Sequence, residues 1–213
     1  MAEISKHVLA LFGDSILDNA PYTRPEPDTT THLQKALGDD WLVRCYARDG
    51  AVMSEVPGQV ATLTKRPAVA VLSIGGNDLT PHISILEQPI TSSGRVFDEL
   101  DRIVQAFDRE YSRVAESVAR KAERTILCTI YEVQLEPSVF ARRVRIPLAA
   151  INDRIIRTAS RLDLEVLELR SICTEKSDFV QQIEPSARGA EKIARAIAAI
   201  VRGETLAKST RIH

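Results

Sequence analysis

The sequence predicts an α/β fold in which helices cover both faces of a parallel sheet. Five short apolar runs are each ended by glycine or polar residues, as is typical of strands buried on both faces. They span residues 8–12, 41–46, 68–74, 125–130 and 164–169. Helical patterns alternate with these runs, and this alternation favours a three-layer α/β/α sandwich. The carboxyl ends of all the strands then lie along one edge, where such sheets bind ligands.

The helices are predicted from apolar residues that recur every third or fourth position. The longest runs from Phe97 to Val118, and a second follows Pro147. The last helix has Ser186 as a plausible N-cap and Gly203 as its stop. Weaker patterns cover about residues 29–38 and 54–64.

Two connections, at about residues 79–95 and 131–146, are predicted to be long loops at the ligand-binding edge, where long loops are commonly functional. The second contains Arg142, Arg143 and Arg145. The favoured interpretation of this charge cluster is a solvated surface. The alternative is a lid that meets an anionic substrate.

Length and composition restrict the classes of protein. A chain of 213 residues suits a single domain spanning residues 1–213. The net charge of -1 gives no basic footprint for nucleic acid. No apolar run is long enough for a membrane span or a signal peptide. Without such a segment, a cytoplasmic protein is expected. The three cysteines, Cys45, Cys128 and Cys173, lack metal-binding spacing, and we expect Cys45 and Cys128 to be buried. The oligomeric state stays open.

Polar residues suited to acyl transfer follow several of the predicted strands. Ser15 comes after the first strand, Gly50 after the second and Asn77 after the third, while Glu184 precedes the last helix. Ser15 would be the nucleophile. The backbone N–H groups of Ser15 and Gly50, with the Asn77 amide, would stabilise an oxyanion. Each segment alone is more typical of an ordinary turn. Their combination, in this order, is much more specific.

Three of these segments resemble the conserved blocks of the SGNH/GDSL esterase and lipase family. They are GDS at 13–15, Gly50 within ARDGA, and GGND at 75–78. The resemblance extends from Val8 to about Val201. It implies a flavodoxin-like sheet of five parallel strands in the order 2-1-3-4-5, with Ser15 as nucleophile and Ser15, Gly50 and Asn77 as oxyanion donors. Members hydrolyse ester, thioester or acetyl groups, usually without a metal, so the resemblance implies a small-molecule ester substrate and no cofactor.

The last block departs from the family pattern. Family members have Asp-x-x-His-Pro, whereas this chain has Glu184 before Pro185, and its nearest aspartate is Asp178. It is similar to a subgroup that carries an IEPS block. Glu184 is therefore the first candidate for the base, with Asp178 as its candidate partner. Burial would raise the pKa of Glu184 and favour this role, whereas a position at the start of a helix would lower it. The sequence leaves the two readings in balance.

The four histidines are weaker candidates for the base. His7 begins the first strand, at the wrong end of the sheet, and His213 is the last residue. His32 and His82 could face the cleft, and geometry decides between them. We also expect Asp14, Asp78, Tyr22 and His82 to shape or contact the substrate site.

Two classes of function remain. The first is a serine hydrolase that cleaves an ester or acetyl group of a small molecule, with an atypical base. The second is a non-hydrolytic protein that binds a small molecule at the same edge, since a fold does not fix a function. A nucleotide-binding module is disfavoured because neither GxxxxGK[ST] nor GxGxxG occurs.

Overall fold

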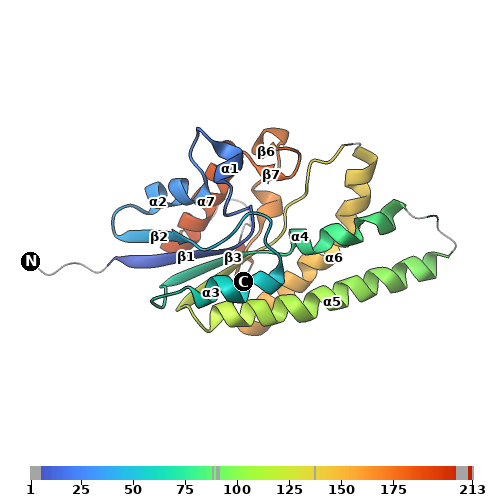
Figure 1. Cartoon of the computed structure of the whole chain (residues 1–213), viewed down its shortest axis with the longest axis horizontal. Coiled ribbons are helices and arrows are strands. Elements are labelled where there is room, and N and C mark those ends of the chain that lie inside the picture. Colours follow the sequence, from blue (N-terminus) through green and yellow to red (C-terminus); the bar gives the residue numbers. More distant parts are fainter. Residues whose placement is uncertain (1–5, 88, 90–91, 137, 205–210, 213) are drawn as a thin grey trace, which may run out of the picture.

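The fold is built on a central sheet of mainly parallel strands (Figure 1). The computed structural model describes residues 6–87, 89, 92–136, 138–204 and 211–212. The parallel strands are β1 (His7–Gly13), β2 (Trp41–Cys45), β3 (Val69–Ser73), β4 (Arg124–Cys128) and β5 (Glu165–Leu167). Their order, β2-β1-β3-β4-β5, confirms the predicted topology. A short strand that was not predicted, β8 (Arg211–Ile212), adds antiparallel to β5.

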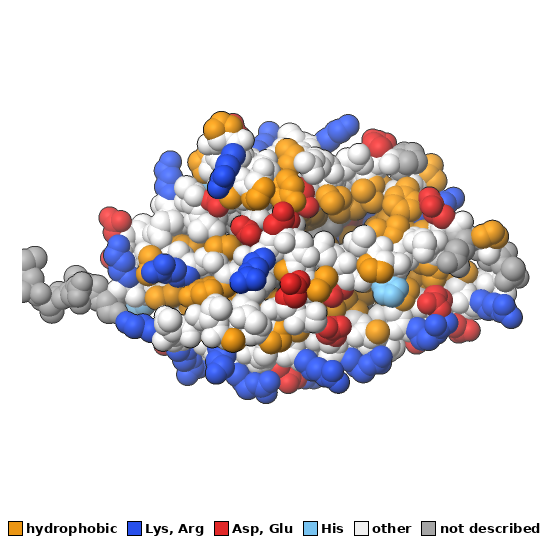
Figure 2. Space-filling view, viewed as in Figure 1, with side chains coloured by type: hydrophobic (Ala, Val, Ile, Leu, Met, Phe, Trp, Pro, Cys, Tyr) orange, Lys and Arg blue, Asp and Glu red, His pale blue; other side chains and the backbone are white. Residues whose placement is uncertain are grey.

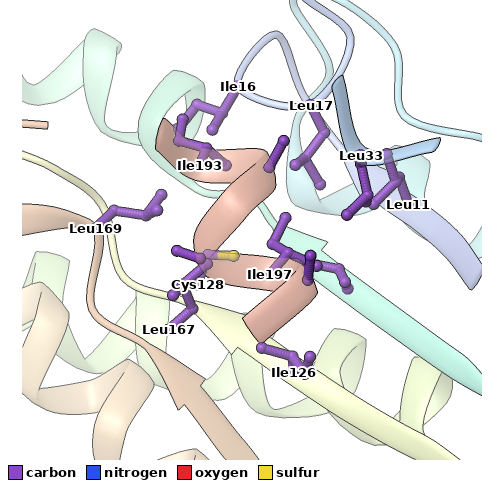
Figure 3. Packing of buried hydrophobic residues seen from close by; sticks show 14 of the residues in the cluster. Leu11, Ile16, Leu17, Leu33, Ile126, Cys128, Leu167, Leu169, Ile193 and Ile197 are labelled. Carbon is purple, nitrogen blue, oxygen red and sulfur yellow. The ribbon is translucent and has the colours of Figure 1, made fainter. Parts of the chain in front are cut away.

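Helices cover both faces of this sheet and bury its alternating side chains. One face carries α2 (Thr29–Leu37) and α7 (Ala187–Arg202), and the other carries α3 (Val56–Ala61), α5 (Ser93–Ala119) and α6 (Ser138–Leu162). Leu11 of β1 packs in the first core with Leu33 and Ile193, as Figure 3 shows. Phe12, the next residue along, packs in the second core. Successive residues of a strand point to opposite faces, so β1 is apolar from Val8 to Phe12.

Short elements complete the chain at the carboxyl edge of the sheet. They are α1 (Ala20–Thr23), α4 (Gly76–Leu79), the antiparallel pair β6 (Phe179–Val180) and β7 (Glu184–Pro185), and 3-10 turns at Met53–Glu55, Thr80–Glu87, Leu169–Ser171 and Lys176–Asp178. We call the β6–β7 pair with its connection, residues 179–185, the ribbon. Figure 1 shows α1 beside the ribbon at the top of the molecule.

The ends of α7 are those the sequence predicts. The Ser186 side chain accepts a hydrogen bond from the Gly189 N–H, and Gly203 takes φ +72° just after the last helical residue. An N-cap of this kind satisfies a donor that the helix itself leaves free.

The prediction of a loop at residues 131–146 was wrong for the second half of that segment. Helix α6 begins at Ser138 and continues through Pro147, which we expected to precede the helix. Val144, Leu148 and Ile151 form one apolar stripe across the proline, and burying this stripe outweighs the hydrogen bond that proline removes. Residues 79–95 likewise contain part of α4, 3-10 turns and the start of α5.

The basic cluster and Cys45 both lie on the surface. Arg142, Arg143 and Arg145 are exposed on α6, and the Arg145 Nε lies 2.7 Å from a carboxylate oxygen of Glu132. The prediction that Cys45 is buried was wrong, because it ends the edge strand β2 and is exposed. Cys128 is buried as expected. No helix in the described part of the chain combines the length and apolarity needed to cross a bilayer.

Candidate active site

The turn that carries Ser15 begins at Gly13, where two strands come into very close contact. Gly13 has φ +128°, and a Cβ atom there would lie 1.7 Å from the Ser73 carbonyl oxygen on β3. Only glycine can occupy this position. The buried side chain of Gln59 on α3 pairs with both backbone groups of Gly13, accepting from its N–H and donating to its oxygen at 2.8 Å each. The backbone is therefore fixed two residues before Ser15.

Ser15 and Asp14 lie together in the following tight turn. The Asp14 N–H donates to the Ser73 oxygen at 3.1 Å, and the Asp14 side chain accepts from the Ile16 N–H at 3.2 Å. Both residues are buried. The pKa of Asp14 is raised to about 7, because burial raises it strongly, the Ile16 hydrogen bond opposes the rise, and the neighbouring charges of Glu184 and Asp78 add to it. Asp14 is thus a carboxyl group that titrates near neutrality.

The ribbon brings Glu184 to Ser15 from the far end of the chain. The Tyr131 hydroxyl donates to the Ile183 carbonyl at 2.6 Å, and the Asn19 side chain donates to the Pro185 carbonyl at 3.4 Å. Backbone contacts therefore hold both neighbours of Glu184. A Cβ atom on Gly189 would lie 2.2 Å from the Asp178 carbonyl oxygen, so α7 packs closely on the residue that precedes the ribbon.

Glu184 is buried and carries an incompletely satisfied carboxylate. It is 9% exposed, and its Oε2 has no hydrogen-bond partner among the described residues. Burial raises its pKa, the hydrogen bond with the Ser15 side chain opposes the rise, and the charge of Asp49 adds to it. Burial therefore has the largest effect, and the pKa of Glu184 is raised. A carboxylate beside the Ser15 hydroxyl, with a raised pKa, accepts a proton more readily than an ordinary surface carboxylate does.

Ser15 and Glu184 line a cleft of about 260 Å³, with Asp14, Asn77 and Tyr131 also in its wall. Most of the remaining lining is aliphatic: Ile16, Leu79, Ile83, Ile130, Val133, Leu135, Val144, Leu148 and Ile183. In Figure 2, hydrophobic side chains gather around a hollow between the ribbon and α4, with acidic side chains at its edge. The cleft therefore combines a few polar groups with a mainly apolar lining, as in many small-molecule sites.

The segment after β3 links two of the predicted site loops. Gly75 takes φ +118° at the end of β3, and the Asn77 side-chain amide donates to the Ala51 carbonyl at 2.9 Å. Both carboxylate oxygens of Asp78 accept from the Met53 N–H at 3.1 Å, so Asp78 fixes the loop after β2. Gly50 lies in that loop at φ +75°, exposed and outside the residues that line the cleft. Asn77 retains a second amide hydrogen that can face a ligand.

The other predicted site residues lie around the cleft rather than in its wall. The Tyr22 hydroxyl lies 3.0 Å from both carboxylate oxygens of Asp49. The Asp178 carboxylate binds the Lys192 ammonium group at 2.8 Å and the N–H groups of Thr174 and Glu175, rather than Glu184.

None of the described histidines lines the cleft. His82 is exposed and lies beside a neighbouring apolar cavity, and His32 is on α2 near Lys35 and Glu191. His7 packs against Trp41, with ring centroids 5.2 Å apart. His213 lies outside the described residues.

Two further residues support the site, and sequence reasoning missed the first of them, Gln59. Gln59 fixes Gly13, and Asn19 joins the turn after Ser15 to the ribbon while accepting from the Thr29 N–H at 2.9 Å. Both are buried polar side chains. Gln59 had a usable signal, because it lies on the same helix face as Val56 and Val60, where the pattern calls for an apolar residue. Within the described ranges, no group of three His, Cys, Asp or Glu residues could hold a metal ion.

Comparisons with known proteins bear on the family and the fold of this chain. The model of the GDSL-like lipase/acylhydrolase family matches residues 11–192. A search of curated proteins gives no significant match. Among solved structures, an extracellular lipase from Streptomyces rimosus has a TM-score of 0.68 at 12% identity, covering 94% of this chain and all of the lipase.

Two esterases show the same fold. An acetyl xylan esterase from Geobacillus stearothermophilus has a TM-score of 0.66 at 15% identity, covering 96% of this chain and 98% of its own. The inhibitor-bound aryl esterase from M. smegmatis has a TM-score of 0.65 at 12% identity, covering 93% of this chain and all of the esterase. At these identities the likeness establishes the fold alone.

Proposed function

Because this chain belongs to the GDSL-like lipase/acylhydrolase family, we propose that it hydrolyses an ester of a small molecule, with Ser15 as nucleophile and Glu184 as base. One observation carries the proposal: the Ser15 side chain lies beside the Glu184 carboxylate, close enough to oppose the rise of its pKa, and both residues line an apolar cleft. A hydroxyl becomes an effective nucleophile when an adjacent base accepts its proton.

In the first half of the reaction, Glu184 accepts the proton of the Ser15 hydroxyl while the Ser15 Oγ attacks the ester carbonyl carbon. The tetrahedral intermediate then expels the alcohol oxygen, which takes the proton back from Glu184. In the second half, Glu184 accepts a proton from water, and the resulting hydroxide attacks the acyl-serine. Breaking the acyl–Oγ bond releases the acid, and the proton on Glu184 returns to Ser15.

The negative charge of each intermediate lies on the former carbonyl oxygen. We assign its stabilisation to the Ser15 N–H, the Gly50 N–H and the free hydrogen of the Asn77 amide. The Asn77 bond to Ala51 supports this role, because it fixes the orientation of the amide before the substrate arrives. Asp14, Asp78 and Tyr22 then act as supports, holding the nucleophile turn and the loop that carries Gly50.

The decisive experiment is covalent labelling with a fluorophosphonate, followed by mass-spectrometric identification of the modified residue. We expect label on Ser15 and none in Ser15→Ala. Glu184→Gln should retain the fold and lose roughly 10²–10⁴-fold in esterase kcat, the usual loss for a general base. The exposed Glu123→Gln is a matched control that should behave like the unmodified protein. Full esterase activity in Ser15→Ala would exclude serine catalysis.

The alternative function is binding of a small molecule without hydrolysis. One observation favours it: no histidine among the described residues lines the cleft, and Asp178 is engaged by Lys192 instead of Glu184. It predicts neither labelling nor ester turnover, but a higher Tm in the presence of a ligand.

We also propose that the protein is cytoplasmic, which suits the free thiol of Cys45 on its surface. We propose further that it is a single domain that uses no cofactor and binds no nucleic acid.

A further inference from the structure

We propose that a second cavity, between α5 and α6, holds the far end of a straight acyl chain whose carbonyl carbon lies at Ser15. We call this space the distal cavity. This inference rests on the proposed function and extends it to a substrate class: esters of medium-length, unbranched fatty acids.

The distal cavity has a volume of about 70 Å³ and presents only apolar surface, although His82 is one of the residues beside it. Helix α5 contributes Leu100 and Ile103, α6 contributes Ile151, and the segment after β3 contributes Ile85 and Leu86. A space without polar groups offers no hydrogen bonds to water and is suited to hydrocarbon.

The distal cavity adjoins the cleft that contains Ser15. Leu79, Ile83, Val144 and Leu148 line both spaces. In the cleft, Asp14 and Glu184 lie beside Ser15, whereas the four residues shared with the distal cavity are all aliphatic. A molecule whose reacting carbonyl lies at Ser15 can therefore extend through apolar surroundings into the distal cavity.

The size of the distal cavity limits what occupies it. Engineered apolar cavities of about 150 Å³ bind benzene, so about half that volume holds roughly two or three methylene groups. The cleft between Ser15 and this cavity accommodates the preceding carbons. Because the two spaces share four aliphatic lining residues, we assign the occupant of the distal cavity to the same substrate rather than to a separate ligand, and an unbranched chain suits this narrow aliphatic boundary.

The test is a kinetic series of p-nitrophenyl esters from acetate to dodecanoate. In the unmodified protein, kcat/KM should rise about fourfold for each methylene that enters the apolar space and then level off. Ile103→Trp fills the distal cavity from a half-buried position. It should lower kcat/KM about 15- to 60-fold for chains that reach the cavity, and leave acetate unchanged.

The matched control is Ile146→Trp, at a position on α6 that is 73% exposed and lines neither space. It should leave the whole series unchanged. Identical chain-length profiles in Ile103→Trp and the unmodified protein would overturn the proposal. If Ile103→Trp does not fold, Leu100→Ala enlarges the same cavity and should lengthen the preferred chain by one or two carbons; an unchanged preference would again overturn it.

Two further arms separate the possible outcomes. Alkyl acetates of increasing alcohol length should respond equally in Ile103→Trp and the unmodified protein, and a loss confined to long alcohols would mean that the cavity holds the alcohol instead. If no ester is cleaved, the proposed function fails. Calorimetric titration with octanamide then tests the cavity alone, and binding that Ile103→Trp does not weaken would refute the assignment.

Discussion

The buried carboxyl group of Asp14 predicts a specific dependence of folding stability on pH. Its pKa is about 7 in the folded protein against 3.8 for the free side chain, chiefly because burial disfavours the charged form. One pKa unit corresponds to about 1.4 kcal/mol, so this difference amounts to about 4 kcal/mol. The folded state holds the proton more tightly, and the resulting stabilisation is complete below pH 3.8 and is lost as the pH rises through about 7.

The substitution that isolates this contribution is Asp14→Asn. Asparagine cannot ionise, and its side-chain oxygen can still accept the hydrogen bond from the Ile16 N–H. The difference in unfolding free energy between variant and unmodified protein should therefore shift in favour of the variant by about 4 kcal/mol from pH 4 to pH 8. Glu184 and other carboxyl groups remain in both proteins, so their contributions largely cancel in this difference.

Urea denaturation at pH 4, 6 and 8 measures the effect directly. The same substitution at the exposed Asp39 shows what the loss of a surface carboxylate does. A difference between Asp14→Asn and the unmodified protein that stays constant from pH 4 to pH 8 would refute the reasoning, because it would mean that Asp14 gains no affinity for protons on folding.

Three further expectations concern catalysis and its support. Asn77→Ala should lower esterase kcat by roughly 10²–10³, the usual loss for one oxyanion donor, with KM changing much less. Gln59→Leu leaves both backbone groups of Gly13 buried without partners, so chemical denaturation should show a loss of about 2–6 kcal/mol, whereas Gln105→Leu on the more accessible α5 surface should cost little. The esterase rate should fall as the pH drops through the raised pKa of Glu184, and a pH–rate profile of Glu184→Gln should lack that limb.

Local sequence patterns were sufficient for the sheet and most of the helices. The central strands β1, β3 and β4 are buried on both faces over most of their length, so each appears as a nearly continuous apolar run that needs no knowledge of its neighbours. The caps of α7 are equally local, because Ser186 and Gly203 act on residues next to them. The start of α6 could not be placed in this way. A proline is usually found in the first turn of a helix rather than in its interior. Helix α6 continues past Pro147 because Val144 and Leu148 pack against the 3-10 turns after α4, and this tertiary contact cannot be read from the local sequence.

The candidate site was partly accessible from the sequence for a related reason. Order along the chain was enough to place Ser15, Asn77 and Glu184 at one edge of the sheet, and all three line the cleft. The partners of Asp178 and the ribbon contacts of Asn19 depend on which distant segments meet. The periodicity of the sequence does not indicate which distant segments come into contact. The role of Asp178 in catalysis stays a prediction.

The contact between Gly13 and the Ser73 carbonyl sets how this chain can vary. In a saturation mutagenesis experiment that scores cellular abundance and activity separately, every substitution at position 13 should reduce both. Substitutions of Ser15 by small residues should reduce activity at nearly normal abundance. Two residues apart, the chain would therefore contain one position that is intolerant for steric reasons and one that is intolerant for chemical reasons, and a score of activity alone would not distinguish them.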